Sequence, residues 1–183
     1  MNFSALITPR PFAAFLTTLF LIGCSPTFNW REVRGTDVPY VIVMPAKPET
    51  TTRSIMLGDL QVMMTMTASE VDQIVFAVGT ATLPDAAKAT ASLQLMKSAL
   101  VNNINGTIRK EKSSGSSQSQ MTAIDIEIIG PSTANLGGQP RLMVVRLIAK
   151  ENKVYQALIV GPEKVVTTES IDTFFTSFKL NGN

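Results

Sequence analysis

Apolar and polar residues alternate over several short stretches of the chain, which is the pattern of β-strands with one buried face. In residues 122–129, isoleucines occupy every second position, while Asp125 and Glu127 stand between them. Alternating stretches or short β-branched apolar runs cover residues 39–44, 53–57, 60–67, 72–78, 122–129, 141–150 and 153–160. The pattern therefore predicts a protein built mainly from strands.

Two pairs of these strands are joined by very short connections. Gly58-Asp59 separates the second and third stretches, and Glu151-Asn152 separates the last two. Connections of two residues are typical of β-hairpins, so each pair is expected to be antiparallel.

A helical period replaces the alternation between residues 84 and 103. Apolar side chains recur there every three or four residues, at Ala86, Ala89, Leu93, Met96 and Leu100. This spacing places them on one face of a helix. Thr82 with Asp85 resembles a capping box at the start of the helix, and Gly106 is expected to end it.

A second helix is predicted over residues 168–177. Thr168 is the expected N-cap, and Glu169 suits the first turn because the positive end of the helix dipole lies there. The order of elements is then strands, helix, strands, helix. With short antiparallel connections, this order predicts the α+β class: a twisted antiparallel sheet with a central helix and a C-terminal helix packed on it.

Polar or glycine-bearing segments separate these elements. Residues 113–120, SSGSSQSQ, are expected to form a flexible loop. The stretch from Gly130 to Gly138 is expected to be a plain connection, since it lacks the Gly-Lys-Ser/Thr ending of a phosphate-binding loop. Residues 24–37 are interpreted as a lipidated N-terminus with a short tether, and residues 38–183 as a single domain.

The first 23 residues differ from the rest of the chain. Their apolar run, FAAFLTTLFLI at 12–22, is shorter than the roughly 20 residues of a membrane-spanning helix, but it suits a signal peptide. The segment Leu21-Ile22-Gly23-Cys24 resembles the lipobox of bacterial lipoproteins. We therefore interpret residues 1–23 as a lipoprotein signal peptide.

The lipobox resemblance implies specific chemistry at three residues. It implies cleavage between Gly23 and Cys24, a lipid on the Cys24 thiol and acylation of the freed amine. Two or three acyl chains would anchor the protein stably, where one chain is marginal. Ser25, which stands where aspartate would retain the protein in the inner membrane, implies sorting to the outer membrane, facing the periplasm. The alternative is an ordinary secreted protein with a chance cysteine.

Composition narrows the possible functions. Cys24 is the only cysteine, so no disulfide can form within the chain, and the absence of histidine excludes Ser-His-Asp and Cys-His catalysis. Histidine-based metal sites are excluded as well. Charges nearly balance, with 16 basic and 14 acidic side chains, so the sequence has no electrostatic signature of nucleic-acid binding.

The chain from about residue 30 to 180 resembles the PsbP/Mog1/DcrB-like group of small α/β sandwich domains. The resemblance lies in Tyr40-Val-Ile-Val-Met-Pro45-Ala-Lys-Pro48, in Tyr155-Gln-Ala-Leu-Ile-Val-Gly-Pro162 and in Ile171-Asp-Thr-Phe-Phe-Thr-Ser-Phe-Lys-Leu180. These are packing and turn residues. The resemblance implies a twisted antiparallel sheet with helices against it. It also implies an accessory or partner-binding role, and no catalytic residue of the group is carried over.

Two sets of residues offer metal or acid–base chemistry. Met56, Met63, Met64 and Met66 are close in sequence, and thioethers bind Cu(I). However, Met64 and Met66 share a strand face with Leu60 and Val62, which favours a role in the core. Asp125 and Glu127 share one face of a strand and could hold a proton or a cation. The more common role of such a pair is a solvated strand face. Trp30, Phe28 and Tyr40 are expected to pack the domain rather than to meet a membrane or partner.

The sequence therefore predicts a non-enzymatic protein without a cofactor or structural metal. Its expected role is that of a cell-envelope lipoprotein, held to a membrane by its lipid, that binds an envelope protein. The alternative is a carrier of a small ligand or lipid, with a pocket between sheet and helix.

Overall fold

The computed structural model describes residues 27–116, 120–134 and 137–180. The elements in chain order are β1 (Arg31–Arg34), β2 (Val41–Met44), β3 (Glu49–Leu57), β4 (Leu60–Val71), β5 (Ile74–Thr82), α1 (Ala86–Asn103), β6 (Thr107–Ser116), β7 (Met121–Thr133), β8 (Gln139–Lys150), β9 (Lys153–Pro162) and α2 (Thr168–Ser177). No helix in these ranges is long and apolar enough to cross a membrane.

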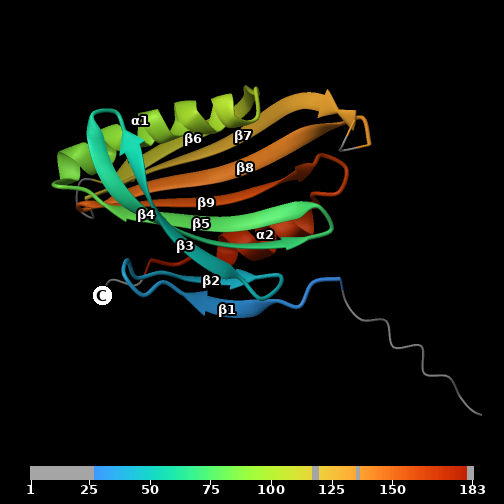
Figure 1. The fold of residues 1–183 in the computed structure, drawn as a ribbon, viewed down its shortest axis with the longest axis horizontal. Coiled ribbons are helices and arrows are strands. Elements are labelled where there is room, and N and C mark those ends of the chain that lie inside the picture. Colours follow the sequence, from blue (N-terminus) through green and yellow to red (C-terminus); the bar gives the residue numbers. More distant parts are fainter. Residues whose placement is uncertain (1–26, 117–119, 135–136, 181–183) are drawn as a thin grey trace, which may run out of the picture.

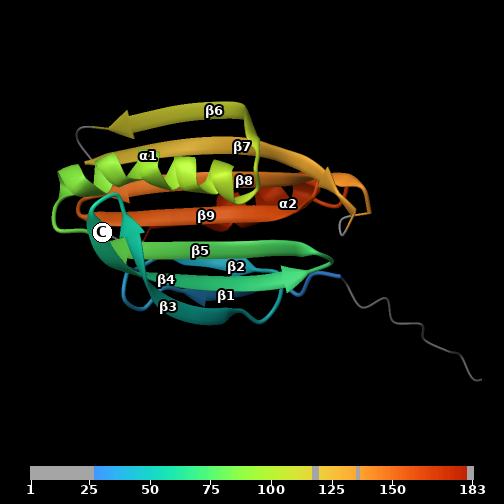
Figure 2. The same cartoon turned by 45° about the horizontal axis from the view of Figure 1, so that its top comes forward.

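A seven-stranded sheet forms the middle layer of the molecule (Figure 1). Its strand order is β3-β4-β5-β9-β8-β7-β6, and every neighbouring pair is antiparallel. The predicted α+β class and the antiparallel sheet are therefore confirmed. Figure 2 shows β3 and β6 as the outermost strands at opposite sides of the sheet.

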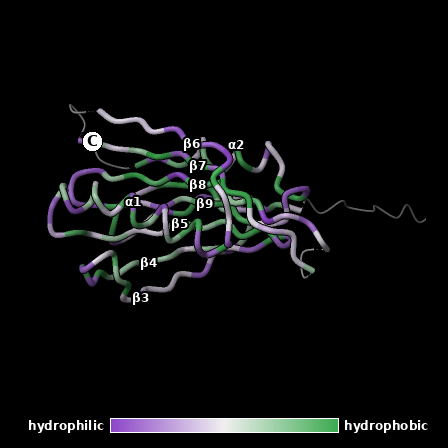
Figure 3. Tube along the Cα trace, turned by 90° about the horizontal axis from the view of Figure 1, so that it is seen from above, coloured by the Kyte–Doolittle hydropathy of each residue, from purple (hydrophilic) through white to green (hydrophobic). Residues whose placement is uncertain are grey.

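The two faces of the sheet are covered by different elements. α1 packs on one face and contributes Leu93, Met96 and Leu100 to a core with strands β4, β5, β7, β8 and β9. The other face carries α2 and the β1–β2 ribbon, whose buried residues include Ile42, Met44 and Phe174 (Figure 1). The central strands are apolar on both faces for this reason, while the edge strands β3 and β6 are polar (Figure 3).

The turns explain how neighbouring strands reverse direction. Gly58 has φ of 62° at the first position of the β3–β4 turn, where a type II′ turn needs glycine. This hairpin was predicted, and so was the β8–β9 hairpin at Glu151. Asp72 and Gln73 both have positive φ, 51° and 65°, and form a further two-residue turn. The strand expected from residue 72 accordingly begins at Ile74.

Both predicted helices are confirmed, but their caps differ from the prediction. Asp85 is itself the N-cap of α1, because its Oδ1 accepts a 2.7 Å hydrogen bond from the Lys88 main-chain N–H. The Thr82–Asp85 capping box was therefore wrong. Thr167, not Thr168, is the N-cap of α2, and Glu169 does lie in the first turn. Ile104, rather than Gly106, is the C-cap of α1.

Two segments expected to be irregular contain strands. The flexible loop predicted at 113–120 was wrong in part, because Thr107–Ser116 forms β6 and pairs with β7. The expected tether contains β1, which pairs with β2. Phe28 and Trp30 pack edge-on against Phe76, and buried Tyr40 packs against Phe178. The packing role predicted for these aromatic residues is confirmed.

Candidate functional site

A groove lies between α2 and the adjacent strands β6, β7 and β8. Its volume is about 600 Å³, which is in the range of ligand-binding clefts. We call it the α2 groove. Its lining residues are Lys110, Glu111, Lys112, Asp125, Ile126, Glu127, Val144, Val145, Arg146, Ile171, Asp172, Phe175 and Thr176.

A row of charged residues crosses the floor of the α2 groove. Lys112 on β6 stands opposite Asp125 on β7, and Asp125 stands opposite Arg146 on β8. Arg146 Nε donates to Asp125 Oδ1 at 2.6 Å, and its Nη2 donates to Asp125 Oδ2 at 3.4 Å. Two parallel bonds of this kind fix the planes of both groups.

Arg146 also joins the sheet to α2. Its guanidinium lies 5.5 Å from the centre of the Phe175 ring, and its Nη1 donates to the Phe175 carbonyl at 3.4 Å. The attraction between a cation and an aromatic face holds the ring against the charged floor. Phe175 and Ile171 on α2, with Val144 on β8, form the apolar part of the groove.

Glu127 has its own basic partners. Arg109 Nε donates to Glu127 Oε1 at 2.5 Å, and Lys110 Nζ donates to Oε2 at 3.2 Å. Burial alone would raise the pKa of the Glu127 carboxyl, but the hydrogen bonds and charges of Lys110 and Arg109 outweigh it, so the pKa is lowered. Arg109 also reaches Glu163, with Nη1 to Oε1 at 2.6 Å.

These contacts decide between the two interpretations of the carboxylate pair. Asp125 and Glu127 share a face, as predicted. Each, however, forms an ion pair with its own basic residue. A carboxylate held in such a pair is poorly placed to pass a proton to a substrate. The pair therefore serves the structure of the groove floor.

Two charged side chains of the α2 groove have no such partner. The Lys112 ammonium makes no hydrogen bond or ion pair with the described residues, and the same holds for the Asp172 carboxylate. One is a cation on the edge strand and the other is an anion on α2. The α2 groove thus offers one unpaired charge of each sign in addition to its apolar residues.

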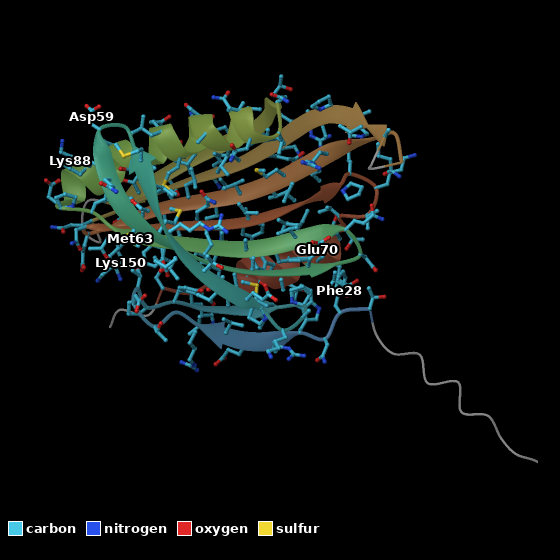
Figure 4. All side chains as sticks on the ribbon, in the orientation of Figure 1. Phe28, Asp59, Met63, Glu70, Lys88 and Lys150 are labelled. Carbon is cyan, nitrogen blue, oxygen red and sulfur yellow. The ribbon has the colours of Figure 1, made fainter. Side chains whose placement is uncertain are left out.

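The methionines do not form one site. Met64 and Met66 face the α1 side, and a methyl group at Gly79 would lie 3.5 Å and 2.5 Å from their respective Sδ atoms. Met56 and Met63 lie on the other face of the β3–β4 hairpin and are 61% and 59% exposed. The core role predicted for Met64 is confirmed. Figure 4 shows Met63 on this hairpin.

The remaining sequence candidates are placed as follows. Gly23, Cys24 and Ser25 lie outside the described residues. The predicted connection that begins at Gly130 starts within β7, which runs to Thr133, and Gly137 and Gly138 turn the chain into β8. In the described ranges no three acidic or cysteine residues cluster as a metal site.

The sequence interpretation missed Arg146, Lys112 and Phe175 as parts of one site. A signal was present in the stretch RLMVVRLIAK at 141–150, where Arg146 interrupts an apolar run. An arginine in such a position needs a partner, because burying its charge unpaired is costly. The partner could not be identified without knowing the strand register.

Fold and groove together define an α+β domain with an antiparallel sheet covered on both faces and a partly apolar groove of mixed charge beside one sheet edge. No protein-family model matches the chain, and a search of curated proteins finds no match.

Proposed function

We propose that the chain is a lipid-anchored lipoprotein of the bacterial envelope whose folded domain binds an extended segment of a partner protein and catalyses no reaction. The anchoring part rests on Leu21-Ile22-Gly23-Cys24 and its resemblance to a lipobox. The binding part is carried by one observation, the α2 groove with its apolar centre and two free charges of opposite sign. The PsbP/Mog1/DcrB-like relationship remains part of the proposal and is consistent with the sheet and its two helices.

The chemistry of the α2 groove favours a polypeptide over a lipid. An acyl chain needs an enclosed apolar cavity, whereas Asp125, Glu127 and Arg146 line this groove. A peptide carries both charges and apolar side chains. We infer an acidic residue against Lys112, an apolar or aromatic residue against Phe175, and a basic residue against Asp172.

The edge of the sheet beside the groove supports an extended conformation for this segment. β6 is exposed along its whole length and pairs only with β7 among the described strands. Its outer main-chain N–H and C=O groups can bond an added strand, the mode known as β-augmentation. Alternate side chains of such a strand would then face the α2 groove.

Photo-cross-linking from the groove tests this function. A photoreactive residue replaces Thr176, an exposed groove residue of α2, in cells that express the full chain. The same residue at Thr90, on the exposed surface of α1, is the matched control. We expect an adduct from Thr176 whose cross-linked segment, mapped by mass spectrometry, is the same in each experiment and contains an acidic residue.

A synthetic peptide of the mapped segment completes the test. Its affinity for the full chain in detergent should fall about tenfold with Lys112→Glu, and should not change with Lys88→Glu. Lys88 is an exposed lysine of α1 on the opposite side of the sheet (Figure 4). Equal adducts from Thr90 and Thr176 would overturn the proposal. An adduct with lipid alone would favour the carrier alternative.

A further inference from the structure

The second edge of the sheet, β3, differs from β6 in its charge pattern. Every residue from Glu49 to Ser54 is exposed, and β3 pairs only with β4 among the described strands. Edge strands of this length usually carry devices that prevent pairing with another chain. On β6, Lys110 and Lys112 share a face and would repel each other if β6 paired with β6 of a second copy, which disfavours self-pairing but not the binding of a partner segment. β3 has no such repetition of one charge.

The charges of β3 are instead opposite and unpaired. Glu49 and Arg53 stand opposite Ala68 and Met64 of β4, so both lie on the α1 side of the sheet. Both line an open groove of about 640 Å³ over β3, β4 and β5. Neither side chain makes an ion pair or hydrogen bond with the described residues. Their Cα atoms lie about 13 Å apart along the strand, since four residues separate them.

The main-chain groups that face outward follow from the register. Leu57 and Leu60 close the two-residue turn and form a hydrogen-bonded pair, so pairs with and without hydrogen bonds alternate from there. Arg53, Thr51 and Glu49 therefore bond to β4. Thr50, Thr52 and Ser54 direct their N–H and C=O groups away from the sheet.

We infer that β3 pairs antiparallel with β3 of a second copy of this chain, with Thr51 on the two-fold axis. In this register Glu49 of each copy stands opposite Arg53 of the other, on the same face. Thr50 stands opposite Thr52 of the other copy, and each such pair exchanges two main-chain hydrogen bonds. The two sheets join into one, and their two open grooves meet at the axis.

Charge selects this register over its neighbours. If the second copy slides by two residues in one direction, Arg53 stands opposite Lys47 of the other copy. If it slides by two residues in the opposite direction, Glu49 and Arg53 both stand opposite uncharged residues. If it slides by four residues in that opposite direction, Arg53 stands opposite Arg53 of the other copy. Among these registers, only the inferred one forms two symmetric ion pairs.

The association is expected to be modest, because one strand pair buries less area than a standard interface. A lipid anchor, as proposed above, would raise the local concentration of the copies. The inference does not depend on the anchor or on the α2 groove, which lies at the other side of the sheet.

Cysteine scanning of the full chain in detergent tests the register. Thr51→Cys places two thiols in a directly opposed pair without hydrogen bonds, where the Cα atoms are about 4.5 Å apart, within disulfide range. Thr52→Cys is the matched control, because its two copies would be diagonal and about 7–8 Å apart. We expect a disulfide dimer with Thr51→Cys, well above the levels of Thr52→Cys and the unsubstituted chain, which retains Cys24.

Charge reversal tests the ion pairs. Glu49→Arg or Arg53→Glu alone should weaken self-association about tenfold, and the double variant Glu49→Arg/Arg53→Glu should restore it. Circular dichroism confirms that each variant is folded. Equal cross-linking of Thr51→Cys and Thr52→Cys would overturn the inference, and so would a double variant no better than the singles. Loss of partner binding at the α2 groove would leave both results unchanged.

Discussion

At the scale of single residues, Arg146 on β8 connects its strand to both β7 and α2. It binds Asp125 through two hydrogen bonds and holds the ring and carbonyl of Phe175. We expect Arg146→Met to lower the free energy of unfolding by about 1–2 kcal/mol, because Asp125 loses its charged partner while remaining partly hydrated.

A neighbouring lysine provides the control for this prediction. Lys110→Met removes a pair to Glu127 whose lysine side chain is 75% exposed, and it should cost less than about 0.5 kcal/mol. Urea unfolding can be followed by the fluorescence of Trp30, the only tryptophan, which packs on Phe76. An equal loss of unfolding free energy in the two variants would show that the Arg146–Asp125 pair contributes no more than an ordinary surface ion pair.

At the scale of elements, the end of α1 packs closely on β7. A methyl group on Gly130 would lie 2.7 Å from the main-chain carbonyl oxygen of Ile104, the C-cap of α1. Backbone cannot move away as a flexible side chain can, so Gly130→Ala should cost about 1–3 kcal/mol.

A second glycine in the same hairpin separates this clash from the general effect of adding a methyl group. At Gly115 the nearest atom to an added methyl is 3.6 Å away, and the residue is exposed. Gly115→Ala should therefore be neutral or stabilise by about 0.4–1 kcal/mol, through the unfolded state. The urea concentration at the midpoint of unfolding, measured for both variants, tests this prediction. A similar loss of stability at both positions would contradict the close packing of α1 on β7.

Elements with a clear period were predictable from sequence, and those without one were not. The isoleucines at 124, 126 and 128 indicate a strand with one face towards a core, and they do face α1. β6 has no such signal, since Lys110-Glu111-Lys112 and its serines are exposed on both faces. Its strand conformation comes from pairing with β7, and that pairing is set by the fold rather than by local preference.

The helix caps and the α2 groove could not be predicted from the sequence either. Thr82 and Asp85 are both good capping residues, and only the actual path of the chain places the Asp85 carboxylate on the Lys88 N–H. The α2 groove needs the register of three strands and the position of α2, which bring Lys112, Asp125 and Arg146 into one row. Composition and spacing carry none of that information.

At the scale of the whole molecule, we propose different binding roles for the two edges of the sheet. The β6 edge, with its lysines and the α2 groove, suits a partner segment, and the β3 edge, with Glu49 and Arg53, suits a second copy. Two such sites, on a domain held at a surface as proposed, would favour assembly there, because tethering raises effective concentration. The central claim is therefore that the domain is held at a membrane through Cys24.

Mass spectrometry of the N-terminal peptide of the chain, purified from the envelope of a bacterial host, tests that claim most directly. We expect a peptide that begins at Cys24 and carries two or three acyl chains, and a Cys24→Ser variant that keeps residues 1–23 and loses the lipid mass. A peptide that begins at another residue, or one that begins at Cys24 with a free thiol and a free amine, would contradict it.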